Sequence, residues 1–188
     1  MLFYEIVSLV LEVLSGLLTG ACLLRLYMQW QRVPFGNPIG RVVFGLTDWL
    51  IMPLRRVIPP WGRWDVSSLV AALLLQTTHF LILWLVPTSP LLLVWLPWLA
   101  IFGLLRVAVG SCMLLLLAYV LMSWTQNQTQ VADLLDRLCQ PLLKPWRKLI
   151  PRVGGMDWSA LVAVLFLQVL LLVIRYLQMH ALALSWMR

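Results

Sequence analysis

Charged residues are scarce in this chain. Only 11% of its 188 residues are charged, and Asp and Glu together number 7. A soluble protein usually has about a quarter charged residues. The hydrophobic fraction is 62% and the mean hydropathy is +0.93. Because a short chain has too little core to bury so much apolar surface, the sequence predicts an all-α integral membrane protein rather than a soluble domain.

Residues that bind metals or act as nucleophiles are also few. The chain has three cysteines and two histidines, and Cys22, Cys112 and Cys139 lack the spacing of a zinc site or a disulfide framework. The sequence shows no nucleophile with a nearby base, no carboxylate pair and no glycine-rich phosphate loop. We therefore expect no enzyme, no catalytic or metal site and no cofactor. A haem site with His79 and His180 as ligands is kept as an alternative.

Four apolar stretches are long enough to cross a membrane, which takes about 20 residues. They are 6–28, 66–86, 91–124 and 158–179. The third is too long for one span and too short for two. We expect 91–100 to form a short interfacial or re-entrant piece and 103–123 to span the membrane, which gives four transmembrane helices. Five spans are the alternative.

Basic residues are concentrated in two segments. Together with Arg25 near the end of the first span, the segment between the first two spans and the segment between the last two hold 11 of the 14 Lys and Arg residues. Cytoplasmic loops of membrane proteins carry such an excess. We predict a multi-pass protein of the bacterial inner (plasma) membrane with both basic loops in the cytoplasm and both termini in the periplasm. Topology then explains the net charge of +7, which does not indicate a nucleic-acid partner.

The chain contains an internal repeat. Residues 53–76 align with 145–168 at an offset of 92, and 13 of the 24 aligned positions are identical. Upstream, Trp30 matches Trp124 at an offset of 94. The sequence thus predicts two tandem units of the same topology, 1–90 and 91–188, each with a span, a basic loop and a second span. Such units are related by an axis along the membrane normal, so we expect a four-helix bundle with a pseudo-twofold axis.

Each basic loop contains an apolar pattern with helical spacing. In the second unit, Leu134, Leu138 and Leu142 recur on one face, and charged side chains occupy the other. The pattern predicts an amphipathic helix in the cytoplasmic interface of each unit. We expect these two helices to end at Pro53 and Pro145.

A duplicated motif, P-x-R-[RK]-x-I-P-x-x-G-x-x-D-x-S, follows each interfacial helix. Its structural positions are Pro53, Pro59, Gly62, Asp65 and Ser67 in the first unit, and Pro145, Pro151, Gly154, Asp157 and Ser159 in the second. Its basic pairs are Arg55 and Arg56, and Arg147 and Lys148. These pairs are candidates for binding phospholipid headgroups or an acidic partner. The alternative is a membrane anchor and turn, in which each Asp caps the following helix.

Four polar residues are candidates inside the membrane. Glu12 and Arg106 occupy equivalent positions at an offset of 94, and they either pair or extend separately to the outer interface. Gln76 and Gln168 are equivalent at an offset of 92. We expect both amides inside the bundle, where they form hydrogen bonds between helices or line a polar path.

The double motif, the run LRLYMQW at 24–30 and Asn37-Pro38 resemble the YggT family of bacterial inner-membrane proteins over nearly the whole chain. The resemblance implies two copies of the family unit, as in the longer proteobacterial members. It also implies a link to osmotic stress and ion uptake, while relatives are associated with cell division and with chloroplast cytochrome assembly. It carries over no catalytic or binding residue.

The hypothesis that fits these features is a non-enzymatic membrane adaptor or assembly factor. Its basic interfacial motifs would face membrane lipids, and we expect either a membrane-protein partner or self-association. One alternative is an ion-transport or channel component linked to osmotic stress. The other is a haem or cytochrome assembly factor.

Overall fold

The computed structural model describes residues 2–59, 64–85, 93–125, 129–149 and 158–186. The elements are α1 (Leu2–Trp30), α2 (Pro38–Val57), α3 (Val66–Leu85), the short 3-10 helix η1 (Leu93–Trp95), α4 (Leu96–Thr125), α5 (Gln130–Leu149) and α6 (Trp158–Trp186). The described residues contain no strand. The predicted all-α class is therefore confirmed.

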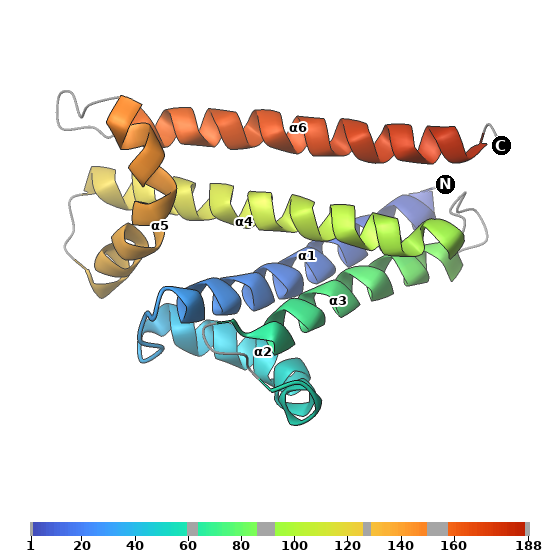
Figure 1. Ribbon diagram of the computed structural model, residues 1–188, viewed down its shortest axis with the longest axis horizontal. Coiled ribbons are helices and arrows are strands. Elements are labelled where there is room, and N and C mark those ends of the chain that lie inside the picture. The colour runs from blue at the N-terminus through green and yellow to red at the C-terminus, as the bar shows by residue number, and fades with distance from the viewer. Residues whose placement is uncertain (1, 60–63, 86–92, 126–128, 150–157, 187–188) are drawn as a thin grey trace.

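Four of these helices are long and apolar enough to cross a membrane. The qualifying stretches are Glu5–Trp30, Val66–Leu85, Leu96–Ser123 and Trp158–Met179. They belong to α1, α3, α4 and α6, so the prediction of four spans is confirmed. The two shorter helices lie at one end of the spans: α2 lies across the α1–α3 pair and α5 across the α4–α6 pair (Figure 1). We call this end the basic end.

The third span differs from the expected one. Helix α4 is continuous over 30 residues from Leu96, so the expectation of a separate interfacial or re-entrant piece over 91–100 is wrong for 96–100. Residues 93–95 form the short helix η1 ahead of it. Pro97 does not break the helix because it lies in the first turn, where a backbone N–H has no intrahelical partner. At 1.5 Å per residue the helix is about 45 Å long. It must therefore tilt in the bilayer or extend beyond it.

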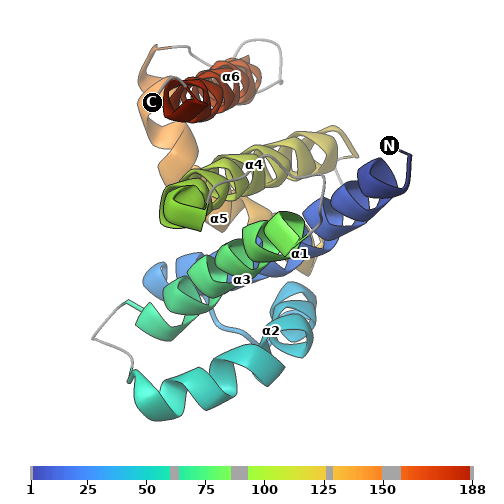
Figure 2. The same ribbon diagram turned by 90° about the vertical axis from the view of Figure 1, so that its right-hand side faces the viewer.

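The interfacial helices also extend further than expected. Helix α2 continues past Pro53 to Val57 and α5 continues past Pro145 to Leu149, so the prediction that they end at these prolines is wrong. A proline inside a helix removes one hydrogen bond and bends the helix without always ending it. Figure 2 shows α2 changing direction along its length. The basic pairs consequently lie in the last turn of each helix rather than in a loop.

The two interfacial helices bury equivalent faces. The buried residues Val43, Thr47 and Ile51 of α2 correspond at the offset of 92 to the buried residues Leu135, Cys139 and Leu143 of α5. Each helix packs on both spans of its own unit. The duplication seen in the sequence therefore extends to the packing of each unit.

The spans do not close into a bundle around a central axis. Helix α3 packs along α1 and α4, whereas α6 packs mainly along α4 and α5. Both views show α6 on the far side of α4 from α1 and α3 (Figures 1 and 2). Gln76 is buried between helices, but Gln168 on α6 is exposed. The expectation that both amides lie inside the bundle is therefore wrong for Gln168, because no span covers that face of α6.

Candidate functional site

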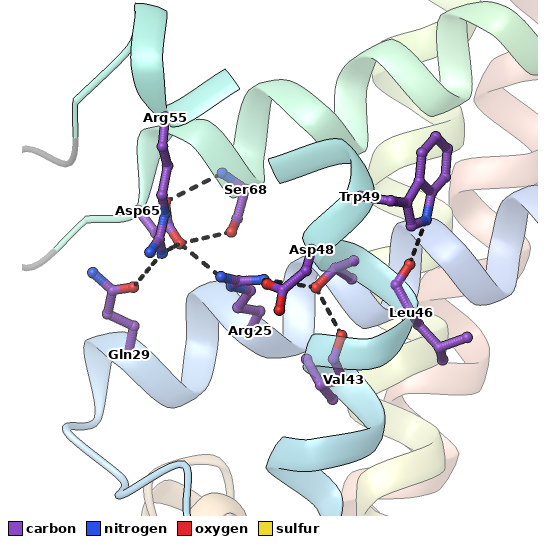
Figure 3. A network of polar contacts seen from close by, with 10 residues as sticks. Arg25, Gln29, Val43, Leu46, Asp48, Trp49, Arg55, Asp65 and Ser68 are labelled. Atoms are coloured by element: carbon purple, nitrogen blue, oxygen red, sulfur yellow. Dashed lines mark hydrogen bonds and ion pairs between the residues drawn. The ribbon is translucent and has the colours of Figure 1, made fainter. Parts of the chain in front are cut away.

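A buried arginine lies at the basic end of the first unit. The guanidinium of Arg25 in α1 donates hydrogen bonds to Asp48 Oδ1 at 2.6 Å and to Thr47 Oγ1 at 2.9 Å, both in α2 (Figure 3). It also lies over the ring of Phe44, 4.3 Å from the ring centroid. Only 1% of Arg25 is exposed. Burying a guanidinium is costly unless it is paired and hydrogen-bonded. These contacts meet that requirement for Nη1, whereas Nε has no hydrogen-bond partner among the described residues.

Asp65 completes this site. It is fully buried just before α3, and its carboxylate accepts hydrogen bonds from the backbone N–H and the hydroxyl of Ser68, which makes it the N-cap of that helix. Arg55 Nη2 lies 2.5 Å from Asp65 Oδ2, and Arg25 Nε lies 3.9 Å from the same oxygen (Figure 3). The two arginines and the carboxylates of Asp48 and Asp65 give a cluster with no net charge. This charge cluster joins α1, α2 and α3.

Sequence reasoning missed the role of Arg25. It counted Arg25 among the basic residues that set the orientation of the loops. A signal was available, since Arg25 is preceded by an apolar run that reaches back to Leu17 and is followed by Leu26 and Tyr27. A charge inside an apolar helix is a candidate for a specific pair.

The second unit has a different arrangement at the same place. Tyr119 occupies the position of Arg25 at the offset of 94. Arg147, the counterpart of Arg55, donates a hydrogen bond to the Tyr119 hydroxyl at 2.9 Å and lies 3.9 Å from Asp136. Asp157, Pro151 and Gly154 of the second motif and Gly62 of the first lie outside the described residues.

The remaining motif positions are described. The Ser67 hydroxyl donates a hydrogen bond to the carbonyl of Ile58 at 2.7 Å, which ties the start of α3 to the end of α2. Ser159 is buried near the start of α6, whereas Pro59 is exposed. The first unit thus uses its motif to fix the turn from the interfacial helix into the span.

The two members of each basic pair have different environments. Arg55 and Arg147 contact side chains of their own unit. Arg56 and Lys148 are exposed. Neither forms an ion pair with a residue in the described part of the chain. The first position of each pair is therefore held by side chains of its own unit, whereas the second position is exposed.

A basic groove lies on α5. The cavity has a volume of about 690 Å³, and its lining consists of Trp30, Gln31, Arg137, Gln140, Pro141, Lys144, Arg147 and Lys148. Four of these side chains are cationic, and Arg137, Lys144 and Lys148 are exposed. Burial raises the pKa of the nearby Cys139 thiol to about 12, so this cysteine stays protonated and is not a nucleophile at neutral pH.

An apolar cavity adjoins the groove. It has a volume of about 760 Å³ between α1, α2 and α4, and Gly16, Leu24, Tyr27, Val42 and Leu115 are among its lining residues. Trp30 lines both the apolar cavity and the basic groove. The two sites therefore meet at this side chain, with cationic groups on one side of it and apolar groups on the other.

Three of the four predicted polar residues of the spans lie in the first unit or on α4, and the fourth, Gln168, is exposed on α6. Arg106 Nη2 lies 3.1 Å from Glu12 Oε1, so the structure joins the two residues in an ion pair. Gln76 donates a hydrogen bond to Thr19 at 3.2 Å, but its Oε1 atom has no hydrogen-bond partner among the described residues. The ring of His79 is buried and lies within hydrogen-bond distance of the Ser15 hydroxyl.

The described residues offer no metal site. No three His, Cys, Asp or Glu side chains among them lie close enough to hold an ion. The features that remain are the charge cluster of the first unit, the basic groove with its apolar cavity, and the polar residues of the spans.

Comparisons with known proteins place the chain in a family. The family model CCB3/YggT matches residues 4–86 and 98–178. The chain is 37% identical to "Uncharacterized protein YggT" of Escherichia coli K12 over 164 residues, which cover 87% of this chain and 86% of that protein. It is 32% identical to an uncharacterized protein of Pseudomonas aeruginosa, with 86% and 84% covered. No solved structure matches the chain. The chain belongs to the CCB3/YggT family.

Proposed function

We propose that this protein is a non-enzymatic membrane adaptor that holds an anionic phospholipid at its basic end and presents it to a partner complex. The observation that carries the proposal is the junction of the basic groove and the apolar cavity at Trp30. A phospholipid has an anionic head and apolar chains, so it matches both halves of this site. The cavity would hold the acyl chains and the groove the headgroup.

The cationic side chains suit a phosphate group. Arg147 is held by the Tyr119 hydroxyl at 2.9 Å, so one donor of the groove is fixed in position. Arg137, Lys144 and Lys148 are exposed around it. Basic clusters at a membrane surface attract anionic lipids by about 1 kcal/mol per residue. One fixed cation and three exposed ones together support a headgroup site rather than a simple anchor.

The sequence assigned the same candidate role to the basic pairs of both units, and this proposal gives them different roles. Arg55 in the first unit is paired with the buried Asp65 and does not line the basic groove. Its neighbour Arg56 is exposed but does not line the basic groove. We therefore assign lipid binding to the second unit and a structural role to the charge cluster of the first.

The test is native mass spectrometry of the protein from vesicles of phosphatidylglycerol and phosphatidylethanolamine. The variant Lys144→Gln with Lys148→Gln should lose most of the bound phosphatidylglycerol. The matched control is Arg41→Gln with Arg56→Gln, which removes two exposed charges of α2 that do not line the groove. Equal loss in both variants would mean that total basic charge rather than the groove retains the lipid.

A second variant tests the apolar half. Gly16 lines the cavity, and a Cβ atom added there meets nothing within 4 Å. Because there is room for the Cβ atom and the position lines the cavity, Gly16→Leu should fill part of the cavity and reduce lipid retention, although the groove keeps all its charges. Unchanged retention would refute the assignment of the acyl chains to this cavity.

One observation favours a second candidate, a transport component. The Glu12–Arg106 ion pair, the Gln76–Thr19 hydrogen bond and the His79–Ser15 contact lie along the same three helices, α1, α3 and α4. Such a polar strip is expensive in a membrane and is often functional. Ion flux through the protein in liposomes, lost on Gln76→Leu, would favour this candidate. Gln168→Leu serves as the control because Gln168 lies outside the strip.

A further inference from the structure

The outward faces of α1 and α6 carry polar groups where lipid would be expected. Glu5 on α1 is exposed, as are Gln168 and Arg175 on α6. Gln168 and Arg175 are seven residues apart, which places them on the same face of the helix with Leu172 between them. Neither Glu5 nor Arg175 forms an ion pair within the described ranges of the chain. Polar side chains at such positions are costly unless a protein surface covers them.

The contact between the two units within one chain shows what kind of protein surface could cover these polar groups. We call this contact the template. Within the chain, α3 of the first unit packs along α4 of the second. A Cβ atom added at Gly103 would meet the side chains of Gln76 and Phe80, so the helices approach most closely there. One turn earlier on α4, Leu99 and Ala100 are also buried.

The residues that form this contact on α4 and α3 have counterparts on the exposed faces of α1 and α6. The buried residues Leu99, Ala100 and Gly103 of α4 correspond at the offset of 94 to Glu5, Ile6 and Leu9 of α1, all of which are exposed. The buried residues Gln76 and Phe80 of α3 correspond at the offset of 92 to Gln168 and Leu172 of α6, which are exposed as well. The pair of surfaces that meet between α3 and α4 therefore recurs uncovered on α6 and α1.

The charges on the two faces are complementary. In the template, Leu83 of α3 lies seven residues beyond Gln76, and Leu99 of α4 lies four residues before Gly103. Because the two helices are antiparallel, these two leucines lie at similar depths. Their counterparts are Arg175 on α6 and Glu5 on α1. Packing of α6 along α1 in the same way would therefore place the Arg175 guanidinium opposite the Glu5 carboxylate.

Gln168 lacks the internal partner that Gln76 has. Gln76 donates a hydrogen bond to Thr19 of its own unit. Thr19 corresponds to Met113 in the second unit, whose thioether is a poor acceptor. The amide of Gln168 makes no hydrogen bond to a residue that the structure describes, and a neighbouring chain could provide one.

We propose that copies of this chain associate head-to-tail, with α6 of one copy packed along α1 of the next as α3 packs along α4 within the chain. Because the two units have the same topology, a rotation about the membrane normal brings these faces together. Because the two surfaces differ, the contact is heterologous, and it closes into a ring when the rotation between copies divides a full turn. A dimer is the smallest such ring. The proposal is independent of the lipid site.

Cysteine cross-linking between two differently tagged copies in one membrane tests the contact. One copy carries Leu9→Cys and the other carries Leu172→Cys, the counterparts of Gly103 and Phe80. The matched control replaces Leu172→Cys by Val173→Cys. Leu172 and Val173 are 61% and 46% exposed, at nearly the same depth, but one residue turns the helix by about 100°. Each single variant paired with the wild-type chain measures the background from the native cysteines.

The expected result is a cross-link between copies that is several-fold more abundant with Leu172→Cys than with Val173→Cys. Equal yields for the two variants would overturn the proposal. A chain that carries both Leu9→Cys and Leu172→Cys gives a further check. A cross-link that forms only within that chain would also overturn the proposal, because α6 would then fold back on its own α1. A charge exchange is the second measurement. Added to the copy with Leu172→Cys, Arg175→Glu should reduce the yield of the cross-link between copies about tenfold, because like charges then face each other. Adding Glu5→Arg to the copy with Leu9→Cys should restore the yield.

Discussion

Replacing Asp65 should destabilise the first unit more than any other single change in the charge cluster. Asp65 is fully buried, caps α3 and accepts from Arg55 at 2.5 Å. Removing a helix cap costs roughly 0.5–2 kcal/mol, and removing one partner of a buried ion pair costs roughly 3–5 kcal/mol. Arg25 keeps its bond to Asp48, so the lower part of the second range applies. We expect Asp65→Ala to lower the free energy of unfolding by about 4 kcal/mol.

Two further variants distinguish the contribution of the N-cap to stability from that of the ion pairs. Asn is as good an N-cap as Asp, so Asp65→Asn should keep the cap, lose the ion pairs and cost about 3 kcal/mol. Asp48→Asn is the matched control. The Asp48 side chain is 40% exposed and that of Arg25 is 2% exposed. Because the Asn oxygen still accepts a hydrogen bond from Arg25, we expect a smaller cost of roughly 1–2 kcal/mol.

The assay is thermal unfolding in detergent with a thiol-reactive dye. Cys22 in the first unit and Cys139 in the second are 1% and 0% exposed, so each reacts only when its surroundings open. A Cys139→Ser chain that also carries Asp65→Ala should react at a lower temperature than one that carries Asp48→Asn. Equal midpoints for these two chains would refute the structural role that we assign to Asp65.

Two other predictions follow from packing and protonation. Gly103→Ala should destabilise the protein by roughly 1–3 kcal/mol because the new Cβ atom meets Gln76 and Phe80. At Gly16 nothing lies within 4 Å of an added Cβ atom, so Gly16→Ala should be neutral or stabilising. The thermal midpoints of the two variants check both expectations. Burial raises the pKa of Cys139 from 9.0 to about 12. The unfolded chain therefore loses this proton first, and stability should decline as pH rises from 9 toward 12. In a Cys139→Ser variant the decline, measured by thermal midpoints across that range, should be smaller.

Local patterns in the sequence predict most of the architecture. Hydropathy gives the four spans because each must match the thickness of a bilayer. The helical spacing of Leu134, Leu138 and Leu142 gives the interfacial helix of the second unit, which lies where the pattern places it, as α5. The offsets of 92 and 94 give the equivalence of the two units. These features depend on residues close together in the chain or on direct comparison of two segments.

The features that sequence reasoning missed depend on distant contacts. Arg25 meets Asp48 and Asp65 from outside its own helix; its apolar neighbours in the chain mark it as a candidate for pairing, but no local pattern identifies these partners. Gln168 has the same sequence context as Gln76 but lies on a helix with an open face. The continuation of α5 beyond Pro145 depends on its packing against α4 and α6. A local preference of proline cannot reveal that packing.

The most direct test of the adaptor role is purification of the protein at its native level in mild detergent, with mass spectrometry of the proteins and lipids that accompany it. The account predicts a reproducible membrane complex together with an anionic phospholipid, both lost in Lys144→Gln with Lys148→Gln and both retained in Arg41→Gln with Arg56→Gln. A preparation that contains no other protein and the same lipids in all three forms would contradict it.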